Sequence, residues 1–290
     1  VMATSANPYD WHFIRGQPWF MRLGPGGLRR PRNPIPGGDF AGLVEAVGSG
    51  DTGDFDEGDE VYGFSHGAFA EYVAAPHGRM ARKPAELTWE QAASLPLAAA
   101  TAWQGLKDEG GIESGQKVLI IGASGGIGSL AVQMAKAWGA EVTGVCSTGN
   151  VALVRSLGAD HVIDYTAEDF TRGEQRYDLI LDNVGTLPLS ETRRVLSADG
   201  TLLSNGAPVG GWTRPLGRIL RVLVSSWFVR QQCRPIVHAY RRDDLLALRD
   251  LVAAGAVRPV IERTHPLSEA PEAVGHVADG HAQGMTVITM

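Results

Sequence analysis

Cysteine is scarce in this sequence, because Cys146 and Cys233 are the only 2 among 290 residues. Two thiols cannot form the disulfide framework of a small secreted protein or a four-cysteine zinc knot, which favours a reducing compartment, by default the cytosol. Long apolar runs are also lacking. The longest in the C-terminal half, residues 222–229, contains two serines and falls far short of the about 20 residues that a bilayer-spanning helix needs. The sequence therefore predicts no membrane partner.

Positive charge is in short supply as well. Lys and Arg number 26 against 32 Asp and Glu, so the formal net charge is −6. This balance gives no general attraction to nucleic acid or to acidic lipid surfaces, and we expect no nucleic-acid partner. The composition, 44% hydrophobic and 20% charged, is that of a turn-rich globular protein. A length of 290 residues predicts two domains, or one domain with a large insertion.

Residues 1–97 are interrupted every few positions by Gly and Pro, which leaves room only for short strands and turns. We expect strands at residues 43–47, 60–64 and 69–74, spaced as in a small barrel or sandwich, and no helix before Trp89. The first part of the chain is therefore predicted to be mostly β.

From residue 117 onward, apolar runs of strand length alternate with helical patterns. A helix is well marked at residues 127–138, where apolar residues recur at helical spacing and Gly139 follows as a terminator. The predicted strands are residues 118–121, 142–145, 161–163, 179–181 and 201–204. This βαβ alternation predicts a doubly wound parallel sheet.

After a predicted helix at residues 243–253, the chain returns to short strands at residues 257–261 and 286–290. The predicted fold class is therefore α/β, with a Rossmann sheet inserted in a split β domain. The expected boundaries are residues 98–254 for the Rossmann domain, and residues 1–97 with 255–290 for the β domain.

A glycine-rich loop lies between the first strand and the first helix of the predicted sheet, which is the context that a dinucleotide site requires. Glycines let the backbone approach a pyrophosphate, and the free N–H groups and the dipole of the helix stabilise its charge. The residues expected to bind the cofactor here are Gly122, Ala123, Ser124, Gly125, Gly126, Ile127 and Gly128.

The second predicted strand ends without a carboxylate. An NAD site usually has Asp or Glu at this place, where it accepts a hydrogen bond from the ribose 2′-hydroxyl. Here the strand ends in Cys146, and Ser147 and Asn150 in the following turn can donate to a 2′-phosphate. We expect these three residues to contact the cofactor and NADPH to be favoured over NADH. The lack of Lys or Arg in the turn weakens this preference.

The same glycine pattern opens short-chain dehydrogenases, which need a Tyr-x-x-x-Lys pair to protonate their substrate. The lysines of this sequence are Lys83, Lys107, Lys117 and Lys136, and none follows a tyrosine by four positions. The long β-rich stretch before the glycines argues the same way. Short-chain chemistry is therefore excluded.

Several further motifs occur in one order along the chain. They are Asn7-Pro8-Tyr9-Asp10-Trp11, Gly38-Asp39-Phe40-Ala41-Gly42, Gly58-Asp59-Glu60-Val61-Tyr62-Gly63, Gly67-Ala68-Phe69-Ala70-Glu71-Tyr72, Leu95-Pro96 with Thr101-Ala102, Leu157-Gly158-Ala159-Asp160 and Asp182-Asn183-Val184-Gly185. With them, essentially the whole chain resembles the medium-chain dehydrogenase/reductase superfamily, in its zinc-independent quinone oxidoreductase (zeta-crystallin-like) branch. The resemblance implies a GroES-like barrel for the β domain and a homodimer. By the same resemblance, further barrel strands are expected before the residue that corresponds to Val1.

The resemblance also implies site residues. It places Asn7, Tyr9 and Asp10 near the nicotinamide ring as catalytic candidates, and His12 either donates a proton there or lines the cleft. The contacts implied for the cofactor are Thr101, Asn183, Val184, Asn205 and Gly206 on the nicotinamide side and Tyr165 on the adenosine side. For Asn183 and Asn205, the alternative interpretation is ordinary turn chemistry at strand ends.

Zinc is not expected. The zinc ligands of alcohol dehydrogenases are Cys, His and a second Cys or Asp, and the matching places here look like Asn7, Gly38 and Leu97. None of the three can supply that set, and the histidines are scattered.

The predicted function is therefore NADPH-dependent, zinc-independent reduction of quinones or α,β-unsaturated carbonyl compounds, with hydrogen-bond donors polarising the substrate carbonyl. Two alternatives stay open: an alcohol or aldehyde oxidoreductase, and a catalytically idle NADPH-binding protein. Met285 stands where relatives commonly carry a basic residue, which weakens the argument for NADPH.

Overall fold

The computed structural model describes residues 1–16, 33–50, 53–205, 230–280 and 283–290. The chain divides into two compact units. The split unit contains Val1–Ala100 and Ala239–Met290, and the inserted unit contains Thr101–His238. Gly206, a predicted cofactor contact, lies outside the described residues.

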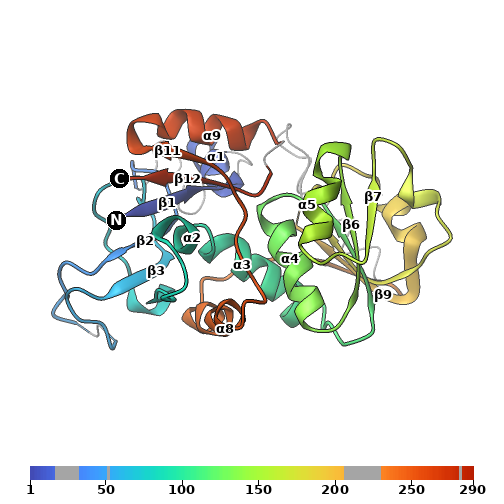
Figure 1. Ribbon diagram of the computed structural model, residues 1–290, viewed down its shortest axis with the longest axis horizontal. Helices are drawn as coiled ribbons and strands as arrows, with labels where there is room; N and C mark the ends of the chain where they lie inside the picture. Colours follow the sequence, from blue (N-terminus) through green and yellow to red (C-terminus); the bar gives the residue numbers. More distant parts are fainter. Residues whose placement is uncertain (17–32, 51–52, 206–229, 281–282) are drawn as a thin grey trace. The chain divides into compact units, whose positions relative to one another are not determined.

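The split unit contains a mixed sheet with the strand order β11-β12-β1-β2-β3-β4. Its strands are β1 (Ala3–Ala6), β2 (Asp39–Leu43), β3 (Glu60–Phe64), β4 (Met80–Arg82), β11 (Ile261–Pro266) and β12 (Met285–Thr289). Only β11 and β12 run parallel to each other among these pairs. The first and last strands, β1 and β12, pair directly, which brings both ends of the chain to one sheet (Figure 1).

Helices pack on this sheet and close its core. They are α1 (Pro8–Arg15), α2 (Trp89–Ala93), α3 (Pro96–Trp103, which continues into the inserted unit), α8 (Arg242–Ala253) and α9 (Ala270–Ala278), with short 3-10 helices at His77–Arg79 and Leu267–Glu269. One core cluster packs Ala273 of α9 against Ile288 of β12. A second joins Phe40, Val61 and Met80 from neighbouring strands. Burial of these side chains supplies most of the free energy that holds the sheet together.

Helix α1 shows that the prediction of no helix before Trp89 was wrong. Asn7 takes an extended N-cap conformation, and Pro8 fits the first helical turn, where no N–H partner is needed. The Asp10 carboxylate reaches back to accept a hydrogen bond from Asn7 N at 2.8 Å. Gly16, with φ of 58°, ends the helix. These local signals act over one short helix, which the frequent Gly and Pro of the region masked in the sequence.

The predicted strands of this unit were partly right. Those at residues 60–64 and 286–290 are confirmed by β3 and β12, whereas the one at 43–47 is displaced toward the N-terminus, where β2 begins at Asp39. No strand forms at residues 69–74 in the described chain, and the one predicted at 257–261 is displaced toward the C-terminus, where β11 begins at Ile261. Phe69 and Val257 are buried there, but their backbone N–H groups donate to the carbonyls of Pro36 and Leu251, outside any strand. Burial alone therefore did not distinguish a packed loop from a paired strand.

The inserted unit contains a parallel sheet with the order β10-β9-β8-β5-β6-β7. Its strands are β5 (Lys117–Ile121), β6 (Glu141–Cys146), β7 (His161–Asp164), β8 (Tyr177–Asp182), β9 (Leu196–Ser204) and β10 (Gln232–Pro235). This is the doubly wound order, with the switch point between β5 and β8, where ligands bind in such folds. The predicted fold class, a Rossmann sheet inserted in a split GroES-like domain, is confirmed.

The helices of the inserted unit connect the parallel strands. They are α4 (Gly126–Ala137), α5 (Val151–Ser156) and α6 (Leu189–Thr192), a π-helical segment at Gln104–Glu109, and 3-10 helices at Thr148–Asn150, Phe170–Arg172 and Arg193–Val195. Helix α4 is followed by Gly139 at φ of 83°, as the terminator prediction required. Leu119, Ile180 and Leu202 belong to the core of the sheet.

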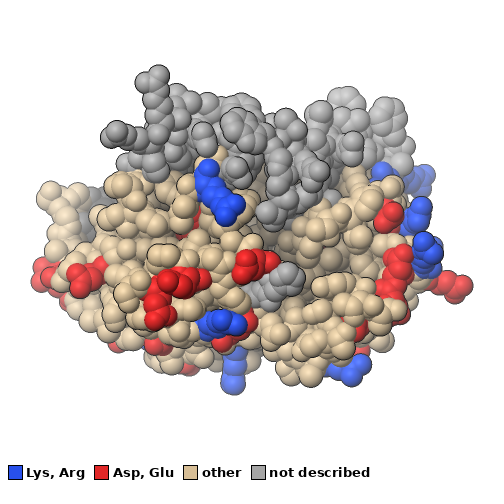
Figure 2. All heavy atoms as spheres, turned by 90° about the horizontal axis from the view of Figure 1, so that it is seen from above, with Lys and Arg blue, Asp and Glu red and all other residues tan. Residues whose placement is uncertain are grey.

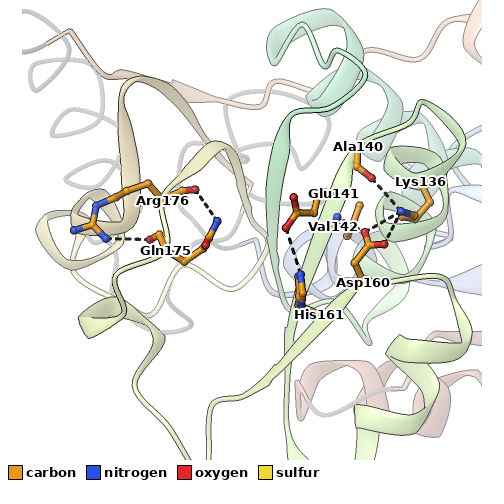
Figure 3. Close-up of polar contacts among 8 residues, drawn as sticks. All are labelled: Lys136, Ala140, Glu141, Val142, Asp160, His161, Gln175 and Arg176. Carbon is orange, nitrogen blue, oxygen red and sulfur yellow. Dashed lines mark hydrogen bonds and ion pairs between the residues drawn. The ribbon is translucent and has the colours of Figure 1, made fainter.

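Polar contacts at one end of α4 fasten this helix to the sheet (Figure 3). Lys136 Nζ lies 2.8 Å from Asp160 Oδ2 and donates to the Ala140 carbonyl at 3.1 Å. The same Asp160 carboxylate accepts from Val142 N at 2.7 Å. The Gly-Ala-Asp motif that contributed to the family resemblance is thus a structural brace between α4, β6 and β7.

Helix α8 belongs to the split unit, although the sequence boundary at residue 254 assigned it to the Rossmann domain. Two contacts explain the difference. Tyr62 Oη of β3 donates to the Leu245 carbonyl of α8 at 2.7 Å, and Arg242 pairs with Asp54 at 2.5 Å. These long-range contacts are invisible in the helical periodicity.

In the described part of the chain, no helix combines the length and the apolar character needed to cross a bilayer. On the face drawn in Figure 2, acidic and basic side chains are scattered among uncharged ones. The described residues of that face therefore present no continuous stripe of one sign.

Candidate functional site

The glycine loop connects β5 to α4 at the switch point of the inserted unit. Gly122 directly follows β5 at φ of 77°, a conformation that a side chain disfavours. Gly125 is the N-cap of α4. A Cβ added to Gly125 would meet the Gly122 carbonyl oxygen at 3.5 Å, an ordinary contact. The first N–H groups of α4 have no partner within the helix, so this end is suited to bind an anion.

Gly128 explains why the loop can be so tight. A Cβ added there would lie 2.0 Å from the Gly122 carbonyl oxygen and 2.9 Å from Ala123 Cα, both backbone atoms. Any side chain would therefore push α4 away from β5. Ser124 lies in the turn before α4 and Ile127 in the first turn of α4, and the loop fits the close approach of a diphosphate.

Two residues expected to bind the cofactor brace the loop from the second strand. Asn150 is buried, and its Nδ2 donates to Ser124 Oγ at 3.1 Å and to Ser147 Oγ at 3.2 Å. The three side chains therefore form one uncharged group between the glycine loop and the turn after β6. Cys146 precedes this turn, and burial raises the pKa of its thiol, as does the Asp164 charge.

A carboxylate does lie beside this turn, and sequence reasoning missed it. Strand β7 pairs with β6 so that Asp164 stands opposite Cys146. Thr148 Oγ1 donates to Asp164 Oδ2 at 2.6 Å, and Thr166 donates to the other oxygen at 2.7 Å. Ser147 and Asn150 follow β6 in sequence, whereas the Asp164 carboxylate comes from the neighbouring strand β7.

Tyr165, the predicted adenosine-side contact, follows Asp164 directly. Its backbone N–H donates to the Cys146 carbonyl at 3.1 Å, and its side chain is 57% exposed. An aromatic ring that is held at the end of β7 and open to solvent is available for stacking on a base.

The predicted nicotinamide-side residues form a second group at the carboxyl ends of β5, β8 and β9. Asn183 Nδ2 donates to the Ile121 carbonyl at 3.4 Å, and Asn205 Nδ2 donates to Asn183 Oδ1 at 3.3 Å. Val184 is exposed, and its Cγ2 would lie 2.9 Å from a Cβ on Gly122. Both the turn interpretation and the cofactor interpretation of the two asparagines are compatible with this arrangement.

Thr101 is the remaining predicted contact of the inserted unit. Its side chain is buried, and Oγ1 lies 3.3 Å from His238 Nδ1. His238 was not predicted, because a lone histidine far from Thr101 in the sequence carries no motif.

The split unit contains the predicted catalytic residues around the start of α1. Asn7 and Asp10 are buried, and Asp39 of β2 joins them. Asn7 Nδ2 donates to Asp39 Oδ2 at 3.0 Å and to Ser5 Oγ at 3.0 Å. Asp39 stands in the Gly-Asp-Phe-Ala-Gly motif, which was the signal that could have identified it.

Burial controls the charge of the two carboxyl groups. Desolvation raises the pKa of Asp10 to about 7, against hydrogen bonds from the Asn7 and Gly37 amides. Desolvation, and then the neighbouring Asp10 charge, raise the pKa of Asp39 to about 8. The pair therefore retains a proton near neutral pH.

Tyr9 lies on α1 in an aromatic group that the sequence did not reveal. The centroid of its ring lies 5.9 Å from that of Phe64, in an edge-on arrangement, and 6.2 Å from that of His66, in a stacked one. Tyr240 stacks on Phe64 with a centroid distance of 3.5 Å. Burial raises the pKa of Tyr9 to about 12, so its phenol stays protonated. Burial and the Arg79 charge lower the pKa of His66. His12 instead packs its ring edge-on against Trp11 at 4.5 Å.

The three places compared with zinc ligands do not fit the metal. A Cβ on Gly38 would lie 2.3 Å from Phe64 Cε2, so no ligand side chain has room there. Leu97 contributes a backbone N–H to Asp39 Oδ1 at 3.1 Å, and the Asn7 amide nitrogen is already bound. Among the described residues, no group of three or more His, Cys, Asp and Glu side chains is placed to hold a metal ion.

Two family models match the chain. The alcohol dehydrogenase GroES-like domain matches residues 1–85, and the zinc-binding dehydrogenase family matches residues 157–288. The second description mentions zinc, whereas Asn7 and Gly38 of the first region do not supply the ligand set of a zinc site.

Known proteins resemble the chain over its whole length. The mouse mitochondrial NAD(P)H oxidoreductase RTN4IP1 is 36% identical over 100% of this chain and 80% of that protein. The chloroplastic NADPH-dependent alkenal/one oxidoreductase of Arabidopsis thaliana is 33% identical over 99% of this chain and 70% of its own length. Those names place the two relatives in organelles, so the cytosolic location of this chain stays a prediction.

A solved structure agrees with these matches. The quinone oxidoreductase from Coxiella burnetii superimposes with a TM-score of 0.86 at 30% identity, covering 100% of this chain and 89% of that one. Sequence, topology and glycine loop therefore lead to one assignment. The chain belongs to the medium-chain dehydrogenase/reductase family and is of the quinone oxidoreductase type.

Proposed function

We propose that this chain reduces quinones or α,β-unsaturated carbonyl compounds with hydride from NADPH, without zinc. The observation that carries the proposal is the loop from Gly122 to Gly128. It is a tight, uncharged cradle at the first turn of α4, at the switch point of the sheet, in a chain of the quinone oxidoreductase type.

The residues of the inserted unit would hold the cofactor, which supplies hydride when it is bound. The amides at the start of α4 would bind its diphosphate, Ser147 and Tyr165 would contact the adenosine end, and Asn183 and Thr101 the nicotinamide end. The names of the relatives support a nicotinamide nucleotide, and one of them specifies NADPH.

The residues of the split unit would serve the substrate. Tyr9 keeps its phenolic proton because its pKa is raised to about 12, so it can donate a hydrogen bond to a carbonyl oxygen. Asn7 and Asp10 would shape the same place, and His12 would line it. The final proton on the reduced substrate would come from solvent or from one of these donors.

The partners that follow are a small quinone or enone and a second copy of the chain as a homodimer. The dimer is proposed from the family resemblance alone. Zinc independence is supported by the clash at Gly38 and by the amide at Asn7, neither of which provides a zinc ligand.

A substrate panel tests the proposal. Purified protein is mixed with NADPH or NADH and a quinone, an enone or an aldehyde, and nucleotide oxidation is followed by absorbance. We expect turnover with quinones or enones and unchanged rates after dialysis against a chelator. Turnover with aldehydes alone would favour an alcohol or aldehyde oxidoreductase, and silence with bound NADPH would favour an idle binding protein. Lost turnover after chelation would contradict the metal-free mechanism.

A further inference from the structure

The buried group around Asn7 contains a residue to which neither the sequence nor the proposed function gave a role. Asp39 is 0% exposed, and three hydrogen-bond donors converge on its carboxyl group. Its Oδ2 accepts from Ser5 Oγ at 3.1 Å and from Asn7 Nδ2 at 3.0 Å, and its Oδ1 accepts from Leu97 N at 3.1 Å. The donors come from separate parts of the chain, so the carboxyl group is the point where they meet.

The backbone fixes where this carboxyl group lies. Strands β1 and β2 pair with Ser5 opposite Asp39, and Thr4 Oγ1 donates to the Asp39 carbonyl at 2.5 Å. Asp39 is therefore held by a paired strand rather than by a loop. A side chain on such an element keeps its partners in place more closely than one on a loop.

Asn7 is held at both of its nitrogen atoms. The Asp10 carboxylate accepts from its backbone N–H at 2.8 Å, and Asp39 with Ser5 accept from its side-chain Nδ2. A protonated Asp39 can direct its proton to Ser5 Oγ, so in either charge state an Asp39 oxygen accepts from Asn7 Nδ2. Asp39 therefore selects one of the two orientations of the Asn7 amide, the one with Nδ2 toward Asp39 and Oδ1 turned away.

We propose that Asp39 is a positioning residue for the reaction: it holds the Asn7 carboxamide with its nitrogen inward, so that Asn7 offers the nicotinamide or the substrate a hydrogen-bond acceptor and not a donor. The inference rests on the proposed function, because that function places Asn7 beside the reacting groups. It assigns the acceptor role to the Asn7 oxygen and leaves the donor role to other groups, such as the Tyr9 phenol.

Asp39→Asn is the direct test, since it keeps the shape of the side chain, leaves an oxygen for Leu97 N and replaces the other oxygen with an amide donor. An asparagine at this position can donate to Asn7 Oδ1, which allows the Asn7 amide to turn over. We expect kcat to fall by about tenfold to a hundredfold with a smaller change in KM, the range for a misplaced group at a reacting centre. Asp244→Asn is the matched control, because Asp244 is another buried aspartate of the split unit, paired with Arg241.

A double-mutant cycle separates positioning from a general structural role. If Asp39 acts through Asn7, Asp39→Asn changes kcat by less than about twofold when Asn7 is already alanine, since interacting residues are not additive. An equal loss in both backgrounds would overturn the inference. So would an unchanged kcat in the single variant.

A second readout needs no turnover. In protein labelled with ¹⁵N at asparagine, the Asn7 side-chain amide is the signal that disappears in Asn7→Ala. We expect its protons to exchange slowly with water in the wild type and in Asp244→Asn, and to shift and exchange faster in Asp39→Asn. Rapid exchange in the wild type would overturn the inference.

Ser5→Ala covers the case in which Asp39→Asn does not fold. It removes one acceptor of Asn7 Nδ2 and leaves Asp39 in place, so we expect a smaller loss of kcat that also vanishes in the Asn7→Ala background. A loss that persists there would count against positioning. If the wild type neither binds nor oxidises NADPH, the proposed function fails, while the amide signal still decides the orientation of Asn7.

Discussion

The two units of this protein prepare for chemistry in opposite ways. In the split unit, the carboxyl groups of Asp10 and Asp39 are buried, and burial raises their pKa. In the inserted unit, the glycine loop and the Ser124–Asn150–Ser147 group are uncharged, and the nearby Asp164 is partly exposed, with hydrogen bonds from threonines that lower its pKa. A diphosphate needs backbone amides and little side-chain volume, whereas a reacting centre needs fixed dipoles in a dry environment.

Gly128→Ala should have the largest effect, because it disrupts the glycine loop of the inserted unit. The new Cβ would meet the Gly122 carbonyl oxygen at 2.0 Å, and a backbone atom cannot move aside cheaply. We expect a loss of about 3 kcal/mol in the free energy of unfolding and NADPH binding weakened by at least about tenfold. Denaturant unfolding and NADPH titration measure both. Gly275→Ala, on helix α9 where the new Cβ would meet nothing within 4 Å beyond its own stretch of the helix, is the control and should be neutral or stabilising. Wild-type affinity in Gly128→Ala would refute the cradle.

The pH dependence of stability should reveal the split unit's buried carboxyl groups. The folded pKa of Asp39, about 8, lies above its ordinary value of 3.8, so the unfolded chain loses this proton first as pH rises. The contribution of the group to stability is therefore full below 3.8 and is lost as pH rises to about 8. We expect the free energy of unfolding to fall with pH across this window in the wild type. The slope should be steeper than in Asp39→Asn by on the order of 1 kcal/mol per pH unit. The free energies of unfolding are measured by urea denaturation at each pH. If they change with pH in parallel in the two proteins, Asp39 is not buried in its protonated form.

Asp164→Asn should sharpen the inserted unit's preference between nucleotides. The Asp164 carboxylate lies beside Thr148, at the place expected for the ribose, where a negative charge opposes a 2′-phosphate. We expect the ratio of kcat/KM for NADPH to that for NADH to rise by about threefold to tenfold. Asp169→Asn is the matched control, because Asp169 accepts similar hydrogen bonds from Thr171 in the same unit. An unchanged ratio would mean that Asp164 acts only on the turn.

Lys136→Ala should have the smallest effect. Its ion pair with Asp160 is partly exposed, and such pairs contribute about 0.2 to 1 kcal/mol. We expect a small fall in thermal stability, with NADPH affinity unchanged, in a calorimetric scan. A fall in NADPH affinity would show that the brace between α4 and β6 shapes the glycine loop.

Parts of this molecule whose signals are local were predictable. The five predicted parallel strands and helix α4 agree with the structure, and the loop from Gly122 to Gly128 lies directly between β5 and α4. Strand β10, with the sequence Gln-Cys-Arg-Pro, lacks an apolar run and was not predicted. Helix α1 was missed because its signal consists of an N-cap and a capping carboxylate rather than periodicity. Helix α8 was assigned to the wrong side of the boundary because the contacts of Tyr62 and Arg242 span the chain.

The amino-acid sequence by itself determined that a dinucleotide cradle forms, because glycine spacing, strand and helix are neighbours along the chain and need no distant partner. Only the tertiary structure decided which carboxyl groups adjoin the two sites. Asp39 reaches Asn7 through the pairing of β1 with β2, and Asp164 reaches Thr148 through the pairing of β6 with β7. Strand pairing joins residues that are far apart in sequence, and the charge and orientation of a side chain depend on what lies beside it in space.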